Sequence, residues 1–170
     1  HQGSKIIRVP GISKIDAFSL IFAQEIHLAL NWLQRFTEVL KSAKSSQRWI
    51  PQETTEELIR SHLEVVFFGK LDHRRTLDFA SKIEPRIFEV KNLDIATHIA
   101  EVNELILQQE LTTQAGFLSN IETQPLTEEQ ARAVLTFDNR VQVVAAAGSG
   151  KTSVMVARTA YAVQRGFIAP

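Results

Sequence analysis

The sequence predicts a mainly α-helical chain in which a strand–loop–helix unit begins near the C-terminal end. Two observations support this fold class. From residue 14 to about residue 117, apolar residues recur mainly at spacings of three and four, as on one face of an α-helix. From residue 141, a short apolar run leads into a turn of small residues and then into another helical pattern. The apolar fraction of 44% is sufficient for a hydrophobic core.

The first ten residues are interpreted as the end of an upstream domain, or as vector-derived residues followed by a strand. His1-Gln2-Gly3-Ser4 resembles a vector-derived remnant and is left out of the fold argument. Residues 5–9 are β-prone, and Pro10-Gly11 would end the strand that they predict. Because a single strand is not stable alone, its partners are expected upstream.

Residues 11–123 are predicted to form a helical N-terminal region. A polar, Ser-rich stretch from Lys41 to Arg48 predicts its first loop, and Gly69 and Gly116 are expected to end helices. Pro85 either kinks a helix or sits in the first turn of the next one. The helical segments are predicted at Lys14 to about Ala43, Pro51 to Phe68, Asp72 to Ile83, and Pro85 to about Phe117.

The composition excludes several kinds of site. Without cysteine there are no disulfides or thiolate metal sites, and the scattered histidines form no metal-binding pattern. The absence of cysteine fits a reducing cytoplasm. No apolar run is long enough for a membrane span, so no membrane partner is expected. The 19 basic and 19 acidic residues balance, so a nucleic-acid surface would have to be local.

Residues 124–170 change in character at Pro125. Thr127 followed three residues later by Gln130 has the spacing of a capping box, which predicts the start of a short helix. Val141 to Ala145 predicts a buried strand, and Lys151 to Gln164 predicts a final helix.

A phosphate-binding motif lies between that strand and that helix. Ala145-Ala146-Ala147-Gly148-Ser149-Gly150-Lys151-Thr152 matches the pattern G-x-x-x-x-G-K-[ST], except that Ala145 replaces the first glycine. Small residues let the backbone N–H groups curl around phosphate oxygens, and the helix that follows adds its positive end. Lys151 would reach the β- and γ-phosphates, and the hydroxyl of Thr152 would bind Mg²⁺.

These residues resemble the first motifs of superfamily 1 helicases of the UvrD/Rep type. Ala146 to Thr152 is similar to their motif I. A second segment resembles their Q motif, namely Pro125-Leu126-Thr127-Glu128-Glu129-Gln130-Ala131-Arg132-Ala133-Val134. The distance between this segment and motif I is similar to that in the family. The helix after motif I is also similar, with Arg158 at a position where the family often has arginine and where we expect a structural role.

The resemblance implies the truncated start of an α/β, RecA-like P-loop NTPase domain with ATP and Mg²⁺ as cofactors. It implies that Gln130 recognises adenine, which the donor and acceptor groups of a carboxamide permit. Lys151 and Thr152 are the candidate catalytic residues, Thr152 also being the Mg²⁺ ligand. Ser153 is counted among the candidate cofactor-binding residues, although many members of the family have arginine at this position. The candidate cofactor-binding residues are Gln130, Ala146, Ala147, Gly148, Ser149, Gly150, Lys151, Thr152 and Ser153.

Upstream, Trp49-Ile50-Pro51-Gln52-Glu53-Thr54-Thr55 resembles the bacterial DNA helicase IV subfamily, which carries an N-terminal extension. The chain is therefore expected to be an N-terminal fragment of an ATP-dependent helicase that translocates on and unwinds single-stranded or partly duplex DNA. The fragment alone is predicted to be inactive, because the family places the remaining hydrolytic groups downstream.

Two other classes of function stay open. One is a different P-loop NTPase, such as an AAA-type ATPase or a kinase. The other is a helical region that docks a protein partner without catalysis. Trp32 and Trp49 would stack on bases in a DNA-binding surface, but core packing is the preferred interpretation. The basic clusters, Lys41 with Lys44 and Arg48, and His73 with Arg74 and Arg75, are interpreted as solvated helix faces.

Overall fold

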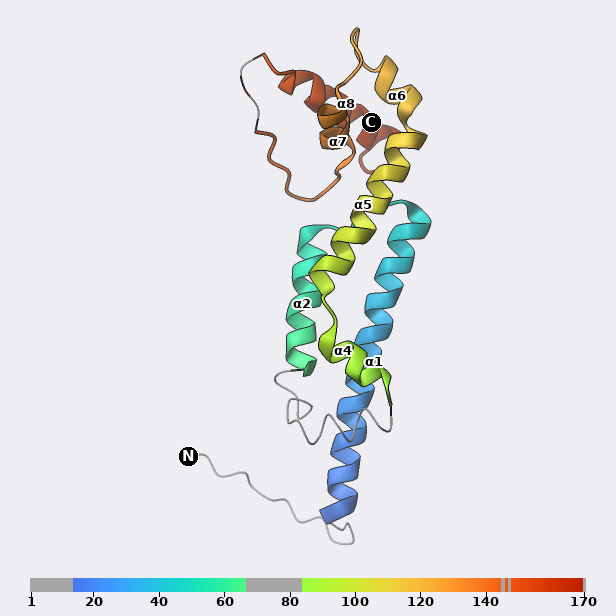
Figure 1. Ribbon diagram of the computed structural model, residues 1–170, viewed down its shortest axis with the longest axis vertical. Coiled ribbons are helices and arrows are strands. Elements are labelled where there is room, and N and C mark those ends of the chain that lie inside the picture. The colour runs from blue at the N-terminus through green and yellow to red at the C-terminus, as the bar shows by residue number, and fades with distance from the viewer. Residues whose placement is uncertain (1–13, 67–83, 145, 147, 170) are drawn as a thin grey trace. The chain divides into compact units, whose positions relative to one another are not determined.

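The structure is a computed structural model that describes residues 14–66, 84–144, 146 and 148–169. For residues 14–22 and 66 only the helical backbone is described. The described part is mainly helical, so the predicted fold class is confirmed to that extent (Figure 1). The strand predicted at residues 5–9, the helix predicted at residues 72–83, and Gly69 lie outside the described residues.

Seven helices are described, and their labels follow Figure 1. Helices α7 and α8 pack against each other, and α5 packs against both α6 and α7. The helices are α1 (Lys14–Ser46), α2 (Gln52–Val66), α4 (Arg86–Asn92), α5 (Ile95–Thr113), α6 (Ala115–Asn120), α7 (Glu128–Leu135) and α8 (Lys151–Gln164).

The chain forms two compact units, each described by itself. Unit 1 combines residues 1–35 with residues 60–93, and unit 2 combines residues 36–59 with residues 94–170. The predicted boundary between residues 123 and 124 lies inside unit 2. The predicted domain boundaries therefore differ from the boundaries of the two compact units. The predicted domains stay a prediction.

The first predicted loop begins later than its composition suggests. Helix α1 continues to Ser46, so the loop prediction for residues 41–48 is wrong over most of its length. The hydroxyls of Ser45 and Ser46 both donate to the carbonyl oxygen of Ser42, at 3.1 and 2.7 Å. Serine in a helix can satisfy its hydroxyl in this way. The helix ends before Gln47, whose φ of 49° is left-handed.

The long helix predicted from Pro85 to Phe117 is broken twice. Pro85 immediately precedes α4, so it begins a helix. Asp94 then caps α5, its carboxylate accepting from the backbone N–H and the hydroxyl of Thr97 at 3.1 and 2.8 Å. An aspartate whose side chain accepts a hydrogen bond from the N–H three residues later acts as an N-cap, so it starts a new helix there. Gly116 does not end a helix, because it lies inside α6 and the break falls at Gln114.

The core of unit 1 contains the side chain of Trp32, which is 5% exposed. Its indole N–H donates to the hydroxyl of Ser61 at 3.0 Å, and its ring lies 4.7 Å from that of His62. Nε2 of His62 lies 2.6 Å from the carbonyl oxygen of Val90, and since a carbonyl only accepts, this nitrogen carries the proton. Packing within the core is thus confirmed for Trp32.

The core of unit 2 lies where α5, α6, α7 and α8 meet. Both helices of the predicted strand–loop–helix region contribute buried side chains to it, so burial holds α7 and α8 together. The buried members are Leu107, Leu118, Ala131, Val134, Leu135, Val154, Ala157 and Tyr161. Trp49 also packs against this cluster, so core packing is confirmed for it too.

The predicted strand at residues 141–145 is wrong over its described part. Residues 141–144 form no strand, and Val144 is 85% exposed. A strand needs a neighbouring strand to satisfy its backbone hydrogen bonds, and no other strand occurs in the part of the chain that is described. The apolar run is therefore present in the sequence without the pairing that would bury it.

A turn between α1 and α2, residues 47–51, is held by side chains from distant parts of unit 2. We call it the anchored turn. The amide of Asn103, on α5, accepts from the backbone N–H of Ile50 at 2.8 Å and donates to the carbonyl of Ile50 at 3.0 Å. The carboxylate of Asp138 accepts from the indole N–H of Trp49 and from the N–H of Gln52, the first residue of α2.

The C-terminal end of α8 holds the other side of the anchored turn. The guanidinium of Arg165 donates to the carbonyl oxygens of Gln47 and Ser46 at 2.9 and 3.3 Å. The guanidinium of Arg48 lies over the ring of Phe167, 5.1 Å from its centroid. Residues of the predicted helical region and of the predicted ATPase start thus form one compact unit.

Candidate functional site

Gln130 and Thr127 form the capping box that the sequence predicts at the start of α7. The hydroxyl of Thr127 accepts from the backbone N–H of Gln130 at 3.3 Å, and Oε1 of Gln130 accepts from the backbone N–H of Thr127 at 2.9 Å. The box fixes the side-chain direction of Gln130, because its oxygen must turn back toward Thr127. The prediction of Thr127 as N-cap is confirmed.

The amide nitrogen of Gln130 reaches the small-residue loop. Nε2 donates to the carbonyl oxygen of Ser149 at 3.0 Å, across 19 residues of sequence. It also lies too close to the position of a Cβ on Gly150 for both atoms to fit, so a side chain there would have to displace the carboxamide. The sequence predicted Gln130 and the loop as parts of one site, and the structure brings them together.

Two glycines give the loop its curvature. Gly148 and Gly150 have φ values of 77° and 82°, in the left-handed region that side chains disfavour. Between them, the backbone N–H and the hydroxyl of Ser149 both donate to the carbonyl oxygen of Ala146, at 3.3 and 2.7 Å. These bonds bring Ser149 back to Ala146 just before α8 begins. Ala145 and Ala147 lie outside the described residues.

The cationic and hydroxyl groups of the predicted site follow at the start of α8. Nζ of Lys151 donates to the carbonyl oxygen of Ala146 at 2.7 Å, so this ammonium lies beside the loop. Lys151 and Thr152 are exposed and Ser153 is partly buried. Gly150 is the N-cap of α8, and no side chain caps this end. The N–H groups of a first helical turn carry partial positive charge, which favours an anion.

Two cavities meet at the contact between Gln130 and Ser149. One, of about 480 Å³, is lined by residues of the Q-motif segment, including Leu126, and by Gly148, Gly150 and Ser153. The other, of about 520 Å³, is lined by Lys151 and by apolar groups that include Ala133 and Val154. The first cavity offers the polar groups and backbone of the loop, and it is large enough for part of a nucleotide.

Arg158 has the structural role that the sequence analysis expects. Its guanidinium donates to the carbonyl oxygens of Ala133 and Thr136, at 2.9 and 2.5 Å, and so binds the C-terminal end of α7. It also stacks on Phe137, with 5.0 Å from Cζ to the ring centroid. Burial lowers the pKa of Arg158 from its ordinary value, with Asp138 acting in the opposite direction. The contact fixes α7 on α8, and with it the position of Gln130.

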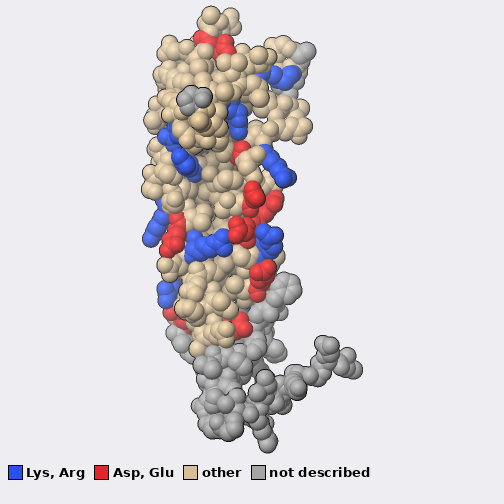
Figure 2. Space-filling model, turned by 180° about the vertical axis from the view of Figure 1, so that it is seen from behind, with Lys and Arg blue, Asp and Glu red and all other residues tan. Residues whose placement is uncertain are grey.

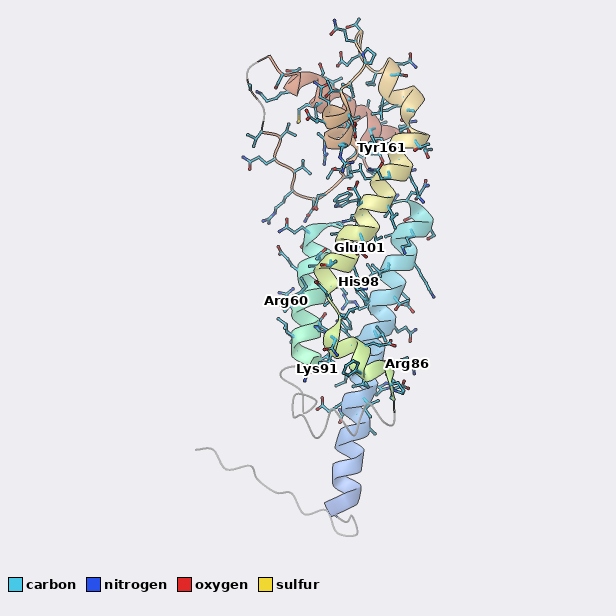
Figure 3. The ribbon with its side chains drawn as sticks, viewed as in Figure 1. Arg60, Arg86, Lys91, His98, Glu101 and Tyr161 are labelled. Carbon is cyan, nitrogen blue, oxygen red and sulfur yellow. The ribbon has the colours of Figure 1, made fainter. Side chains whose placement is uncertain are left out.

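A buried polar cluster that the sequence analysis missed joins α5 to α8. Tyr161 lies on α8 (Figure 3), and its hydroxyl donates to Oε2 of Glu110 at 2.7 Å. The guanidinium of Arg165 lies 3.5 Å from Oε1 of the same carboxylate. Glu110 is only 2% exposed, and neither its Oε1 nor Nε of Arg165 has a hydrogen-bond partner. Burial, together with Glu110, raises the pKa of Tyr161. A single sequence gives little signal for such a cluster, because Glu110 lies on the apolar stripe of a helix.

On the face that Figure 2 draws, the charges of the described residues do not mark out a binding surface. On the described part of the face that Figure 2 draws, lysine and arginine lie among aspartate and glutamate. Among the described residues, no group of three or more His, Asp or Glu is placed to hold a metal ion. None of the described helices is long and apolar enough to cross a membrane.

Comparison with known proteins agrees with these motifs. Residues 126–170 match the family described as UvrD/REP helicase N-terminal domain. The resemblance to UvrD/Rep-type helicases is confirmed. DNA helicase IV of Escherichia coli (strain K12) is 28% identical over 144 residues, which cover 84% of this chain and 21% of that protein. The chain thus spans about a fifth of the length of this relative, and no solved structure matches it significantly.

Proposed function

We propose that this chain contributes the nucleotide-binding start of an ATP-dependent DNA helicase. The carrying observation is the loop from Ala146 to Thr152. It is closed by two left-handed glycines, leads directly into a helix without a side-chain cap, and holds an ammonium beside its own backbone. Backbone amides, a helix end and a lysine are the groups that bind a triphosphate.

In this proposal the phosphates of ATP lie on the loop, and the ammonium of Lys151 moves from the carbonyl of Ala146 to the β- and γ-phosphates. Thr152 provides a hydroxyl for Mg²⁺, and Gln130 faces the adenine in the cavity beside the Q-motif segment. Bound Mg²⁺ neutralises charge on the phosphates during their transfer. The similarity to DNA helicase IV supports DNA as the substrate of the whole protein. A cytoplasmic location is part of the same proposal.

The fragment is expected not to hydrolyse ATP by itself. The loop and Gln130 position phosphates and base, but hydrolysis also requires a positioned water and charge stabilisation on the transferred phosphoryl group. In the family that the chain resembles, segments beyond motif I supply these groups. Steady-state ATP hydrolysis by the purified 170 residues would contradict this part of the proposal.

The central test is Lys151→Ala in the full-length protein. Loss of the countercharge is expected to lower the rate of ATP hydrolysis by about 100-fold or more, as for removal of one key electrostatic group, and strand separation with it. Lys91→Ala is the matched control, because this lysine lies on α4 in unit 1. The proposal fails if Lys151→Ala hydrolyses ATP and separates strands at the wild-type rate.

A further inference from the structure

The contact between Gln130 and Ser149 indicates a second role for Gln130, which rests on the proposed function. We propose that Gln130 is a positioning residue for the phosphate loop, holding the carbonyl of Ser149 so that the following amide is directed for phosphate binding. In this role its effect does not depend on the base of the nucleotide.

The hydrogen-bonding capacity of the carboxamide allows both roles at once. Oε1 accepts one hydrogen bond, from the N–H of Thr127, and Nε2 donates one, to the carbonyl of Ser149. A glutamine side chain has two acceptor sites and two donor hydrogens. One acceptor site and one donor hydrogen therefore remain for adenine while the loop is held.

The geometry of the peptide bond explains what this contact does. The peptide joining Ser149 to Gly150 is planar and trans, so its carbonyl oxygen and its N–H point in opposite directions. By fixing the carbonyl of Ser149 toward α7, Gln130 also fixes the direction of the N–H of Gly150. This N–H is one of the amides that must converge on phosphate oxygens.

The carboxamide of Gln130 also lies close to Gly150. Its Nε2 leaves too little room for a Cβ there, so the missing side chain of Gly150 is what lets the carboxamide approach the loop. The backbone of Gln130 is itself held, since α7 buries Ala131 and Val134 and its Arg132 pairs with Glu104 at 2.9 Å. The support for the loop is thus anchored in the helical core of unit 2.

Binding of a ligand that has phosphates but no base separates this role from adenine recognition. The full-length protein is titrated with Mg²⁺–ATP and with Mg²⁺–tripolyphosphate, as wild type, as Gln130→Ala and as Glu128→Ala. We expect Gln130→Ala to weaken tripolyphosphate binding about fivefold, the contribution of one hydrogen bond, and ATP binding by more. Glu128 is exposed on the same turn and lines neither cavity, so Glu128→Ala should bind both as wild type does.

Hydrogen–deuterium exchange of the nucleotide-free proteins gives a second readout. Amides of residues 148–152 should exchange faster in Gln130→Ala than in Glu128→Ala, while those of α5 should not change. Should Gln130→Ala lose stability, Gln130→Met, which keeps the length of the side chain, is measured in its place.

The outcomes are distinct. Tripolyphosphate binding within twofold of wild type, with ATP binding reduced, would show that Gln130 serves adenine alone and would overturn the inference. Unchanged exchange over residues 148–152 would also overturn it. A wild-type protein that binds neither probe would overturn the proposed function itself.

Discussion

Replacing Tyr161 with phenylalanine tests whether the buried cluster stabilises unit 2. The change removes one hydroxyl and keeps the ring, which contacts Phe137 and Phe167. The lost hydrogen bond, 2.7 Å long, is donated to a carboxylate that is 2% exposed and whose other oxygen has no hydrogen-bond partner. Hydrogen bonds to charged groups contribute about 1.5–3 kcal/mol, so we expect the free energy of unfolding to fall by about 2 kcal/mol.

The assay is guanidinium unfolding of the 170-residue chain in a Trp32→Phe background, which leaves Trp49 as the fluorescent reporter of unit 2. In a protein that already carries Glu110→Gln, adding Tyr161→Phe should lower the free energy of unfolding by only about 1 kcal/mol, because the acceptor is then neutral. A cost below about 0.5 kcal/mol in both backgrounds would refute the reasoning, since the bond would then stabilise nothing.

Three further predictions follow from unit 2. Asn103→Ala leaves the N–H and carbonyl of Ile50 without their partner in a buried place, and should cost about 3 kcal/mol in the same unfolding assay. Asp138→Ala removes the hydrogen bond that caps the first N–H of α2 and should lower the free energy of unfolding by about 1 kcal/mol. Circular dichroism should then show helix loss at a lower guanidinium concentration. In the folded protein the pKa of Tyr161 is raised above its ordinary value of about 10, so its contribution to stability is complete below pH 10 and declines as the pH rises above it. Tyr161→Phe should remove this decline when the free energy of unfolding is measured at several pH values above 10. If the free energy of unfolding falls equally steeply with pH in both proteins, the predicted direction is wrong.

The helices and the capping box could be predicted from sequence because their signals are local. Thr127 and Gln130 stand three residues apart, and the apolar periodicity of α1 and α8 needs no knowledge of the rest of the chain. The link between Gln130 and the loop was expected only through the family resemblance. Its geometry, a carboxamide that donates to the carbonyl oxygen of Ser149 and lies close to Gly150, depends on how α7 packs on α8.

The failures share a physical cause, which is competition between local propensity and contacts elsewhere. Asp94 ended a helix that apolar spacing would continue, because its carboxylate binds the turn ahead. Residues 141–144 have the composition of a buried strand but lack a partner within the described chain, and a ladder cannot be inferred from one segment alone. Glu110 was not singled out from the sequence, because its partners Tyr161 and Arg165 lie more than 50 residues further along the chain.

The anchored turn has a consequence for how this protein can be divided. Asn103 and Arg165 bind its backbone and Asp138 binds the indole of Trp49, so the turn is held by residues that lie far from it in the sequence. A cut placed before the Q-motif segment would therefore separate Asp138 and Arg165 from the turn that they bind. Engineers who wish to graft residues 124–170 onto another protein should carry residues 36–59 and 94–123 along with them.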